Sequence, residues 1–176
     1  RLERAQDLLY ENKLDALLIS NPSNLRYFIG IDTHFWESPT RPWFLVVPLS
    51  GRPVGIIPEI GESLFEKSFV KDIYTWSSPN VNGDDISPLK SVLESLPSRF
   101  GAIGAELGKE MTIRMPVVDF GLLQGNSKFD IIDGTSVIWN LRTVKTLNEI
   151  KKIERVSKIV SDVFETLPTF ISLNDS

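Results

Sequence analysis

The stretch LDALLISNPSNLRYFIG, residues 14–30, decides the fold of this chain. Its early part, residues 15–20, is a short apolar run bounded by polar residues, which is typical of a buried strand. Asn21 and Pro22 then predict the start of a helix, because Asn is a good N-cap and Pro suits the first helical position. Gly30 predicts the end of that helix, where a left-handed residue is commonly required. The segment therefore predicts a strand that leads directly into a short helix.

Outward from this segment, helices and strands continue to alternate. Apolar spacing and capping residues predict further helices over 2–12, 61–69, 87–96, 112–123 and 146–168. Further strands are predicted over 43–48, 54–59, 73–76, 102–106 and 129–133. Turn residues at 50–53 join the first two of these strands into a hairpin, so the sheet is mixed rather than purely parallel. The predicted fold class is α/β, a mixed β-sheet flanked by helices on both faces.

The last predicted helix has the clearest signals. Thr146 and Glu149 form a capping box, in which the Thr hydroxyl and the Glu carboxylate each bond a free backbone amide of the first turn. An apolar stripe then follows, and Pro168 is expected to stop the helix. We expect the stripe either to pack on the sheet or to belong to a part of the protein outside this chain. Residues 140–146 are the expected linker before it.

Composition excludes several classes of function. The net charge is −4, so no general attraction to nucleic acid or to an anionic membrane is expected. No apolar run is long enough to span a bilayer, and the charged N-terminal residues do not resemble a signal peptide, so cytoplasm is the default expectation. The chain has no cysteine and one histidine. Thiolate catalysis and Cys-type zinc sites are therefore excluded, and neither a nucleophile elbow nor an H-E-x-x-H pattern is present. We expect no catalytic residue and no metal ligand in this chain.

The candidate binding residues lie in one loop, residues 32–43, between the predicted helix and strand. It holds a His, two Trp, a Phe and an Arg among acids and prolines. Trp and Arg are enriched at binding hot spots, and loops on a rigid scaffold often carry recognition. Arg41 is the first candidate, because a guanidinium binds a carboxylate through two hydrogen bonds. His34 and Trp36 are the others. The structural alternative is that the aromatic residues only cap the core and Arg41 forms a local salt bridge.

Three segments in this order resemble the creatinase/prolidase/aminopeptidase P family. They are LDALLISNPSNLRYFIG at 14–30, WFLVVPLSGRPVGIIPE at 43–59 after Arg41, and LRTVKTLNEIKKIERVSKI at 141–159. The motifs N-P-x-N-x-x-Y-x-x-G and R-x-x-K-T-x-x-E-I are moderately specific separately, and much more so in this order. The resemblance implies that residues 1–140 are the family's N-terminal domain, which is ribonuclease-H-like. Residues 141–176 would be the linker and first helix of a truncated C-terminal pita-bread domain.

The resemblance also implies that the two domains have different roles. In this family two divalent metal ions, usually Mn, Co or Zn, are bound by two Asp, one His and two Glu of the pita-bread domain, so this chain alone should be inactive. The N-terminal domain supports a homodimer or higher homo-oligomer. In creatinase-like members, its loop reaches a neighbouring subunit's active site with an aromatic and an arginine. Arg41 matches that arginine, whereas the aromatic position is Pro39, so Trp36 or Phe35 would have to substitute.

The parent protein is therefore expected to be a metal-dependent Xaa-Pro dipeptidase or aminopeptidase-like hydrolase. Its substrate would be a small peptide or other small molecule. Two alternatives stay open. One is a creatinase-like or dimethylsulfoniopropionate-lyase-like relative. The other is a catalytically inactive protein-binding module.

Overall fold

The structure is a computed structural model of the 176-residue chain, and it describes residues 1–38, 41–80 and 86–172. The chain divides into two compact units. The first runs from Arg1 to Leu141 and the second begins at Arg142. Each unit is described by itself.

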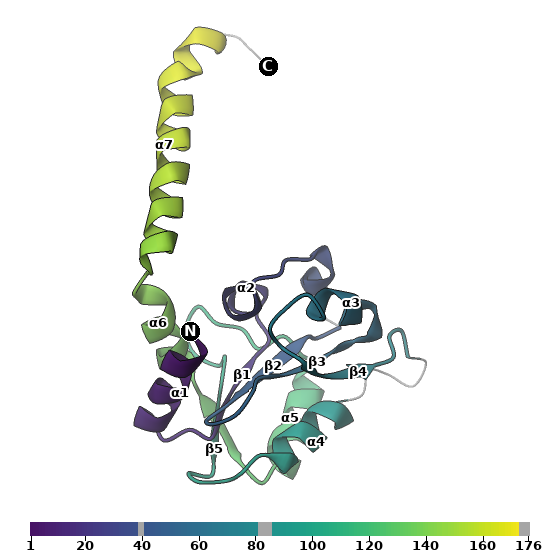
Figure 1. Cartoon of the computed structure of the whole chain (residues 1–176). Helices are drawn as coiled ribbons and strands as arrows, with labels where there is room; N and C mark the ends of the chain where they lie inside the picture. The colour runs from purple at the N-terminus through teal and green to yellow at the C-terminus, as the bar shows by residue number, and fades with distance from the viewer. Residues whose placement is uncertain (39–40, 81–85, 173–176) are drawn as a thin grey trace. The chain divides into compact units, whose positions relative to one another are not determined.

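The first unit is built on one mixed sheet (Figure 1). Its strands within the described residues are β1 (Ala16–Ile19), β2 (Phe44–Pro48), β3 (Val54–Pro58), β4 (Asp72–Trp76), β5 (Ala102–Ala105) and β6 (Asp130–Asp133). They lie in the order β4-β3-β2-β1-β5-β6. Strand β2 runs antiparallel to both β1 and β3, and the other neighbouring strands are parallel. The carboxyl ends of β1, β3, β4, β5 and β6 therefore meet at one edge of the sheet.

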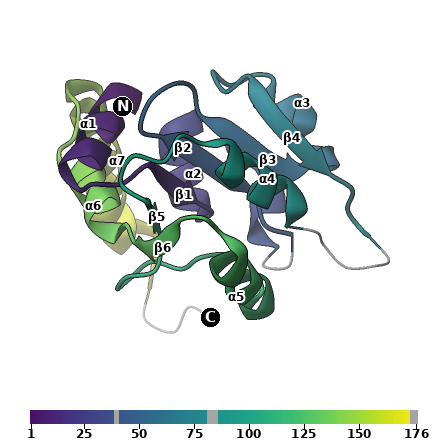
Figure 2. The ribbon, with the colours of Figure 1, turned by 90° about the horizontal axis from the view of Figure 1, so that it is seen from below.

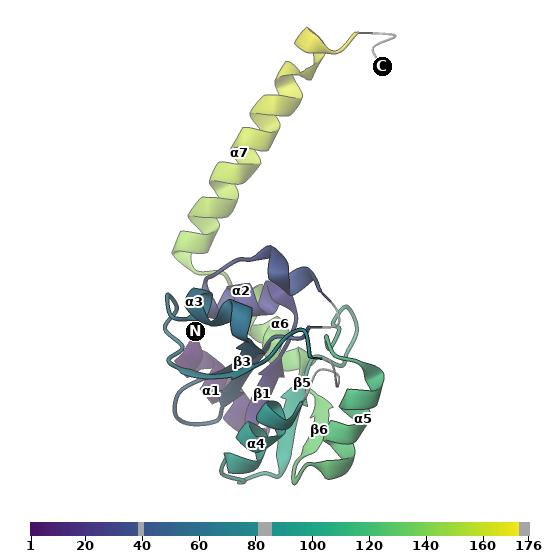
Figure 3. The same cartoon turned by 90° about the vertical axis from the view of Figure 1, so that its right-hand side faces the viewer.

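Helices cover both faces of this sheet. They are α1 (Leu2–Glu11), α2 (Pro22–Ile29), α3 (Glu62–Phe65), α4 (Ser87–Ser95), α5 (Val117–Asn126) and α6 (Thr135–Thr143), with the short 3-10 turns η1 (His34–Glu37) and η2 (Glu59–Gly61). Figures 2 and 3 show α4 and α5 on one side of the sheet, with α1 and α6 on the other. The α/β prediction, with a mixed sheet between two helical layers, is confirmed.

Strand β1 shows how the sequence builds two cores. Its side chains alternate between the faces, because successive residues of a strand point in opposite directions. Leu17 and Ile19 join a core with residues of α1, α2, α3 and α6. Ala16 and Leu18 join a second core with residues of α4 and α5. The strand is buried throughout, which explains why it reads as a continuous apolar run.

The predicted caps around the first helix are confirmed. The Asn21 side chain accepts a hydrogen bond of 3.0 Å from the Ser23 amide, and Pro22 is the first helical residue. Gly30 ends α2 in the left-handed conformation, at φ 74°. These local signals suffice because each satisfies a backbone group that the helix end leaves unpaired.

Four predicted details are wrong. Helix α5 starts at Val117, not at residue 112, because Pro116 is extended and serves as its N-cap. The Ser87-Pro88 pair predicts a cap followed by the first helical residue, but Ile86 is the N-cap of α4 and Ser87 is already helical. Helix α6 was not predicted, and it extends to Thr143, into the expected linker. The expected loop at 32–43 contains the turn η1.

The second unit contains α7 (Leu147–Phe170). The capping box is confirmed: Thr146 Oγ1 accepts from the Glu149 amide, and Glu149 accepts from the Thr146 amide at 2.7 Å. The expected stop at Pro168 is wrong, because the helix continues to Phe170. A proline so close to the end of a helix removes only one of the last backbone donors. Among the residues described, no helix combines the length and the hydropathy needed to cross a lipid bilayer.

Candidate functional site

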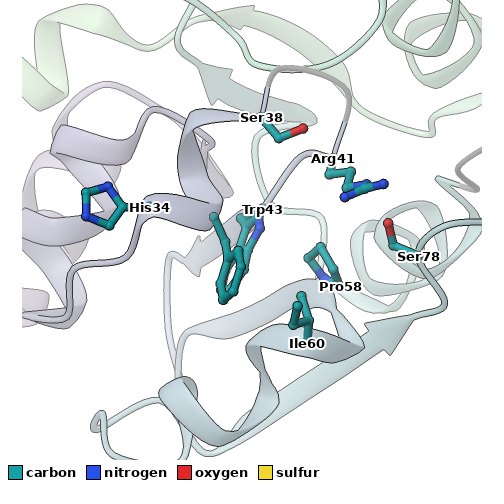
Figure 4. A pocket seen from close by; sticks show the side chains of 8 residues that line it. His34, Ser38, Arg41, Trp43, Pro58, Ile60 and Ser78 are labelled. Carbon is teal, nitrogen blue, oxygen red and sulfur yellow. The ribbon is translucent and has the colours of Figure 1, made fainter.

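A pocket of about 190 Å³ opens beside the segment that joins α2 to β2 (Figure 4). It lies at the ends of β3 and β4 where the chain leaves the sheet, and open α/β sheets commonly bind ligands at this edge. Four parts of the chain line it: the η1 segment, the residues just before β2, the end of β3 with the η2 turn, and the segment that follows β4. The lining residues are His34, Phe35, Ser38, Arg41, Trp43, Pro58, Ile60 and Ser78.

Trp43 forms the rigid apolar wall of the pocket. It is only 3% exposed, and its ring packs edge-to-face against Trp36, with centroids 6.1 Å apart, and tilted against Phe65. Gly61 lies directly beneath it, so closely that a Cβ at this position would overlap the indole ring. The close approach explains the glycine and fixes the position of the wall.

Arg41 and Ser78 supply the polar groups at one end of the pocket. Arg41 is exposed, and its guanidinium makes no ion pair or hydrogen bond with a described residue. The hydroxyl oxygen of Ser78 is shielded from solvent and has no hydrogen-bond partner among the described residues. Figure 4 shows both side chains directed toward the same part of the pocket.

The structure brings two of the three predicted binding residues to this pocket. Arg41 and His34 line it at opposite ends, with Trp43 between them (Figure 4). Trp36 does not line it: the ring is 2% exposed and belongs to the core under α2 and α3. Its side chain supports Trp43 from behind, which is the core-capping alternative for this residue. Pro39 lies outside the described residues.

Sequence reasoning missed Trp43 as a wall and Ser78 as a lining residue. Trp43 is the last residue of the predicted loop, and its position immediately before β2 is the signal that could have identified it. Ser78 gives no local signal, because it lies in the segment after β4 and reaches the pocket only through the parallel pairing of β3 with β4.

Side-chain contacts brace the segment that carries Arg41. Thr33 caps η1 by accepting a hydrogen bond of 3.2 Å from the Phe35 amide. The guanidinium of Arg114 donates a hydrogen bond of 2.9 Å to the carbonyl oxygen of Glu37, the last residue of η1. These contacts hold the turn from both ends, four residues before Arg41.

A buried carboxylate lies at the same edge of the sheet. Glu106, which follows β5, is completely buried. It accepts hydrogen bonds from the Ser20 amide and hydroxyl, from the Asn21 amide and from the Asn24 side chain, at 2.5 to 3.0 Å. Burial raises the pKa of the Glu106 carboxyl above its ordinary 4.5, and the hydrogen bonds oppose that rise. Because Ser20 and Asn21 lie between β1 and α2 and Asn24 lies in the first turn of α2, the carboxylate fixes the start of α2.

The described residues offer no site for a metal centre. No three His, Asp or Glu side chains come together in residues 1–38, 41–80 and 86–172. Glu106 and Asp133 carry carboxylates that could in principle bind a metal. Both accept hydrogen bonds instead from neighbouring hydroxyl, amide and backbone groups. The two divalent ions implied by the resemblance therefore do not fit these residues, and no catalytic step is assigned to them.

Comparison with known proteins identifies relatives of the whole first unit. The sequence profile of the creatinase/prolidase N-terminal domain matches residues 1–144. No curated protein matches the chain at a significant level.

Several solved structures share the fold. The prolidase from Pyrococcus horikoshii OT3 superposes with a TM-score of 0.69 at 18% identity, over 97% of this chain and 43% of that protein. The Xaa-Pro dipeptidase from Bacillus anthracis gives 0.76 at 17% identity, over 99% and 44%. The creatinase/prolidase N-terminal domain of an X-Pro dipeptidase from Streptococcus pyogenes gives 0.60 at 18% identity, over 79% and 96%. The chain thus spans less than half the length of the first two proteins and most of the third.

Proposed function

Because the chain belongs to the family of creatinase/prolidase N-terminal domains, we propose that it is the non-catalytic, substrate-lining domain of a metal-dependent Xaa-Pro dipeptidase-like hydrolase. The catalytic domain would lie in the part of the protein outside this chain and would hold the two divalent ions, Mn, Co or Zn. Metal ions in such hydrolases polarise the scissile carbonyl and activate a water. The role of the present chain would be to bind the substrate and orient it.

One observation carries this proposal: Arg41 lies at an apolar pocket, and its guanidinium forms no ion pair or hydrogen bond within the part of the chain that the structure describes. A guanidinium has only donors, and its flat fork matches a carboxylate. A dipeptide ends in a carboxylate. The indole of Trp43 and the ring of Pro58 supply an apolar surface next to the cation, which suits the side chain of the terminal residue.

The pocket opens at an exposed segment, so a second subunit can reach it. We propose that the protein is a homodimer or higher homo-oligomer and that Arg41 reaches the active site of a neighbouring subunit. A cation supplied in this way would bind the substrate carboxylate without disturbing the metal ligands of that site.

The test uses the full-length protein that contains this chain, loaded with Mn²⁺ and assayed for hydrolysis of glycyl-L-proline. Arg41→Ala is expected to raise KM about 10- to 100-fold, the value of a charge-assisted pair, with kcat changed less than about twofold. Metal content should not change. Arg52→Ala, in the exposed turn between β2 and β3, is the matched control and should leave KM unchanged. Absence of hydrolysis in the wild type, or an unchanged KM for Arg41→Ala, would overturn the proposal.

A mixing experiment tests the placement in a neighbouring subunit. Subunits carrying Arg41→Ala are mixed with subunits disabled in the metal centre, and hybrid oligomers are allowed to form. If Arg41 acts across the interface, the hybrids regain a site with wild-type KM. If it acts within its own subunit, each hybrid contains only defective sites.

A further inference from the structure

We propose that Ile60 is a specificity-determining residue of this pocket, and that it contacts a ring-sized apolar side chain on the same substrate residue whose carboxylate Arg41 binds. The inference rests on the proposed function and deepens it, because it specifies the substrate class as peptides that end in a large apolar residue. Phenylalanine should fill the pocket better than proline does.

The first argument is the exposure of Ile60. Its side chain is 57% exposed and lines the pocket, so a ligand can reach it from solvent. Ile60 belongs to η2, and the next residue of that turn, Gly61, lies buried beneath the Trp43 ring. The turn thus places its smallest residue under the rigid wall and leaves a large apolar side chain uncovered at the pocket (Figure 4).

The second argument is that η1 repeats this arrangement. Trp36 is buried and packs edge-to-face on Trp43, whereas its neighbour Phe35 is 49% exposed and lines the pocket. Each turn therefore braces Trp43 with one residue and offers the preceding apolar residue to the pocket. A single exposed apolar side chain needs no explanation, but two that line one pocket with a buried indole indicate a binding surface.

The third argument is size. The pocket has a volume of about 190 Å³. An apolar protein cavity of about 150 Å³ is large enough to bind benzene, so this pocket has room for one phenyl ring. The ring of proline is smaller and would leave part of the apolar lining in contact with water. Because binding is favoured by the apolar area removed from water, the larger ring should bind more tightly.

The fourth argument is the combination of charge and apolar surface in one small pocket. Its apolar lining residues are Phe35, Trp43, Pro58 and Ile60, its cation is Arg41, and no described lining residue is Asp or Glu. The complementary ligand therefore carries a negative charge close to a large apolar group. The C-terminal residue of a peptide provides both, because its carboxylate and its side chain are attached to the same carbon atom.

The test measures binding to the full-length protein by ligand-observed NMR titration. The probes are N-acetylglycine, N-acetyl-L-proline and N-acetyl-L-phenylalanine, which share the carboxylate and differ in the side chain. In the wild type, Kd should decrease in this order, by about 10-fold or more between the first and the last. Ile60→Ala should raise Kd for N-acetyl-L-phenylalanine about fivefold and leave Kd for N-acetylglycine unchanged.

Two further variants separate binding from a structural role. Ile60→Leu conserves the volume and should keep the preference of the wild type for N-acetyl-L-phenylalanine. Ile132→Ala makes the same truncation as Ile60→Ala at a similarly exposed position in β6, outside the pocket, and is the matched control. Because Ile60 is more than half exposed, Ile60→Ala should leave Tm close to that of the wild type.

The outcomes also separate this inference from the proposed function. If Arg41→Ala weakens binding of all three acids and Ile60→Ala leaves their relative Kd values unchanged, the role of Arg41 stands and the role of Ile60 is overturned. If the wild type binds N-acetyl-L-proline more tightly than N-acetyl-L-phenylalanine, the size argument is wrong and the inference falls with it. If Arg41→Ala leaves Kd unchanged for every probe, the proposed carboxylate site fails first.

Discussion

The side-chain amide of Asn24 donates a hydrogen bond of 2.5 Å to the carboxylate of Glu106, which lies 82 residues away in the chain. Asn24 belongs to the N-P-x-N motif that begins α2, and Glu106 follows β5. Both residues are fully buried. The contact joins the first turn of α2 to the residue that follows the neighbouring parallel strand β5, so it helps to fix the start of α2.

Truncation of this carboxylate should be costly. Glu106→Ala removes the acceptor for two backbone amides and the Asn24 side chain and leaves these donors buried. We expect the free energy of unfolding to fall by about 3 kcal/mol, as is typical when buried donors lose a charged acceptor. Urea denaturation at neutral pH measures it. Glu94→Ala, which removes an exposed partner of Lys90, is the control and should change stability by less than about 0.5 kcal/mol. A small loss for both variants would show that water replaces the carboxylate.

The same carboxyl makes stability depend on pH. Burial raises the pKa of Glu106 above 4.5, so the folded protein holds this proton more tightly than the unfolded chain. The stabilisation that comes from this tighter proton binding is complete below the ordinary pKa and is lost as the pH rises through the raised value, whereas the hydrogen bonds of the carboxylate remain. The wild type should therefore lose stability relative to Glu106→Gln as the pH increases from about 4.5 toward neutrality. Parallel urea titrations of the two proteins test the sign. If the wild type instead gains unfolding free energy relative to Glu106→Gln as the pH rises, the hydrogen bonds lower the pKa of Glu106 more than burial raises it.

These contacts show what the sequence could and could not reveal. The caps at Asn21, Gly30 and Thr146 are local, since each bonds backbone groups within a few residues, and the sequence predicted all three. The network of Glu106 depends on pairing between strands that are distant in the chain. No periodicity or motif near Glu106 indicates that its partners are Ser20 and Asn24.

The errors in the predicted helices concern local signals that were misjudged. Apolar residues near 112 suggested a helix, but Pro116 fits the cap better than the interior, so α5 starts after it. Helix α6 packs Val137, Ile138 and Leu141 into the core, and this spacing was a usable signal. For the site, composition indicated the correct loop and Arg41 as a candidate. It did not show that Trp36 is buried, because an aromatic residue in a loop can point either way.

Gly61 is predicted to tolerate no side chain. Gly61→Ala would place a methyl group inside the indole of Trp43, and overpacking of this kind costs about 1–3 kcal/mol. The ring would have to move, so the variant should also raise KM for glycyl-L-proline in the full-length protein. Gly121→Ala is the matched control. Gly121 lies in α5, where nothing lies within 4 Å of an added Cβ, and the change should stabilise by about 0.5–1 kcal/mol. Equal effects of the two substitutions would contradict the packing argument.

The capping box of α7 gives a prediction for the second unit. Thr146→Ala removes the hydroxyl that accepts from the Glu149 amide and should weaken the first turn of the helix by about 1 kcal/mol. Hydrogen exchange at the Glu149 amide should accelerate about fivefold, whereas amides near Val160 should not change. Thr166→Ala is the control, because its hydroxyl bonds only the Val163 carbonyl within the helix. Uniform acceleration along α7 would indicate that the cap controls the whole helix and not one turn.

Loss of the hydrogen bond between the Arg114 guanidinium and the Glu37 carbonyl should affect the pocket more than the stability of the fold. The main-chain amide of Arg114 bonds the Ser20 hydroxyl, and Arg114→Ala leaves that contact in place while removing the guanidinium from the Glu37 carbonyl. We expect stability to change by less than about 0.5 kcal/mol, because the side chain is partly exposed.

The turn η1, however, loses the bond at its end, so the Phe35 and Trp36 amides should exchange a few-fold faster, and KM for glycyl-L-proline should rise about two- to fivefold. Arg99→Ala is the matched control, since that guanidinium stacks on the rings of Tyr10 and Phe100. If exchange in η1 is unchanged while KM rises, Arg114 contacts the substrate itself. If neither changes, the Thr33 cap and the burial of Trp36 are sufficient to hold the turn that leads to Arg41.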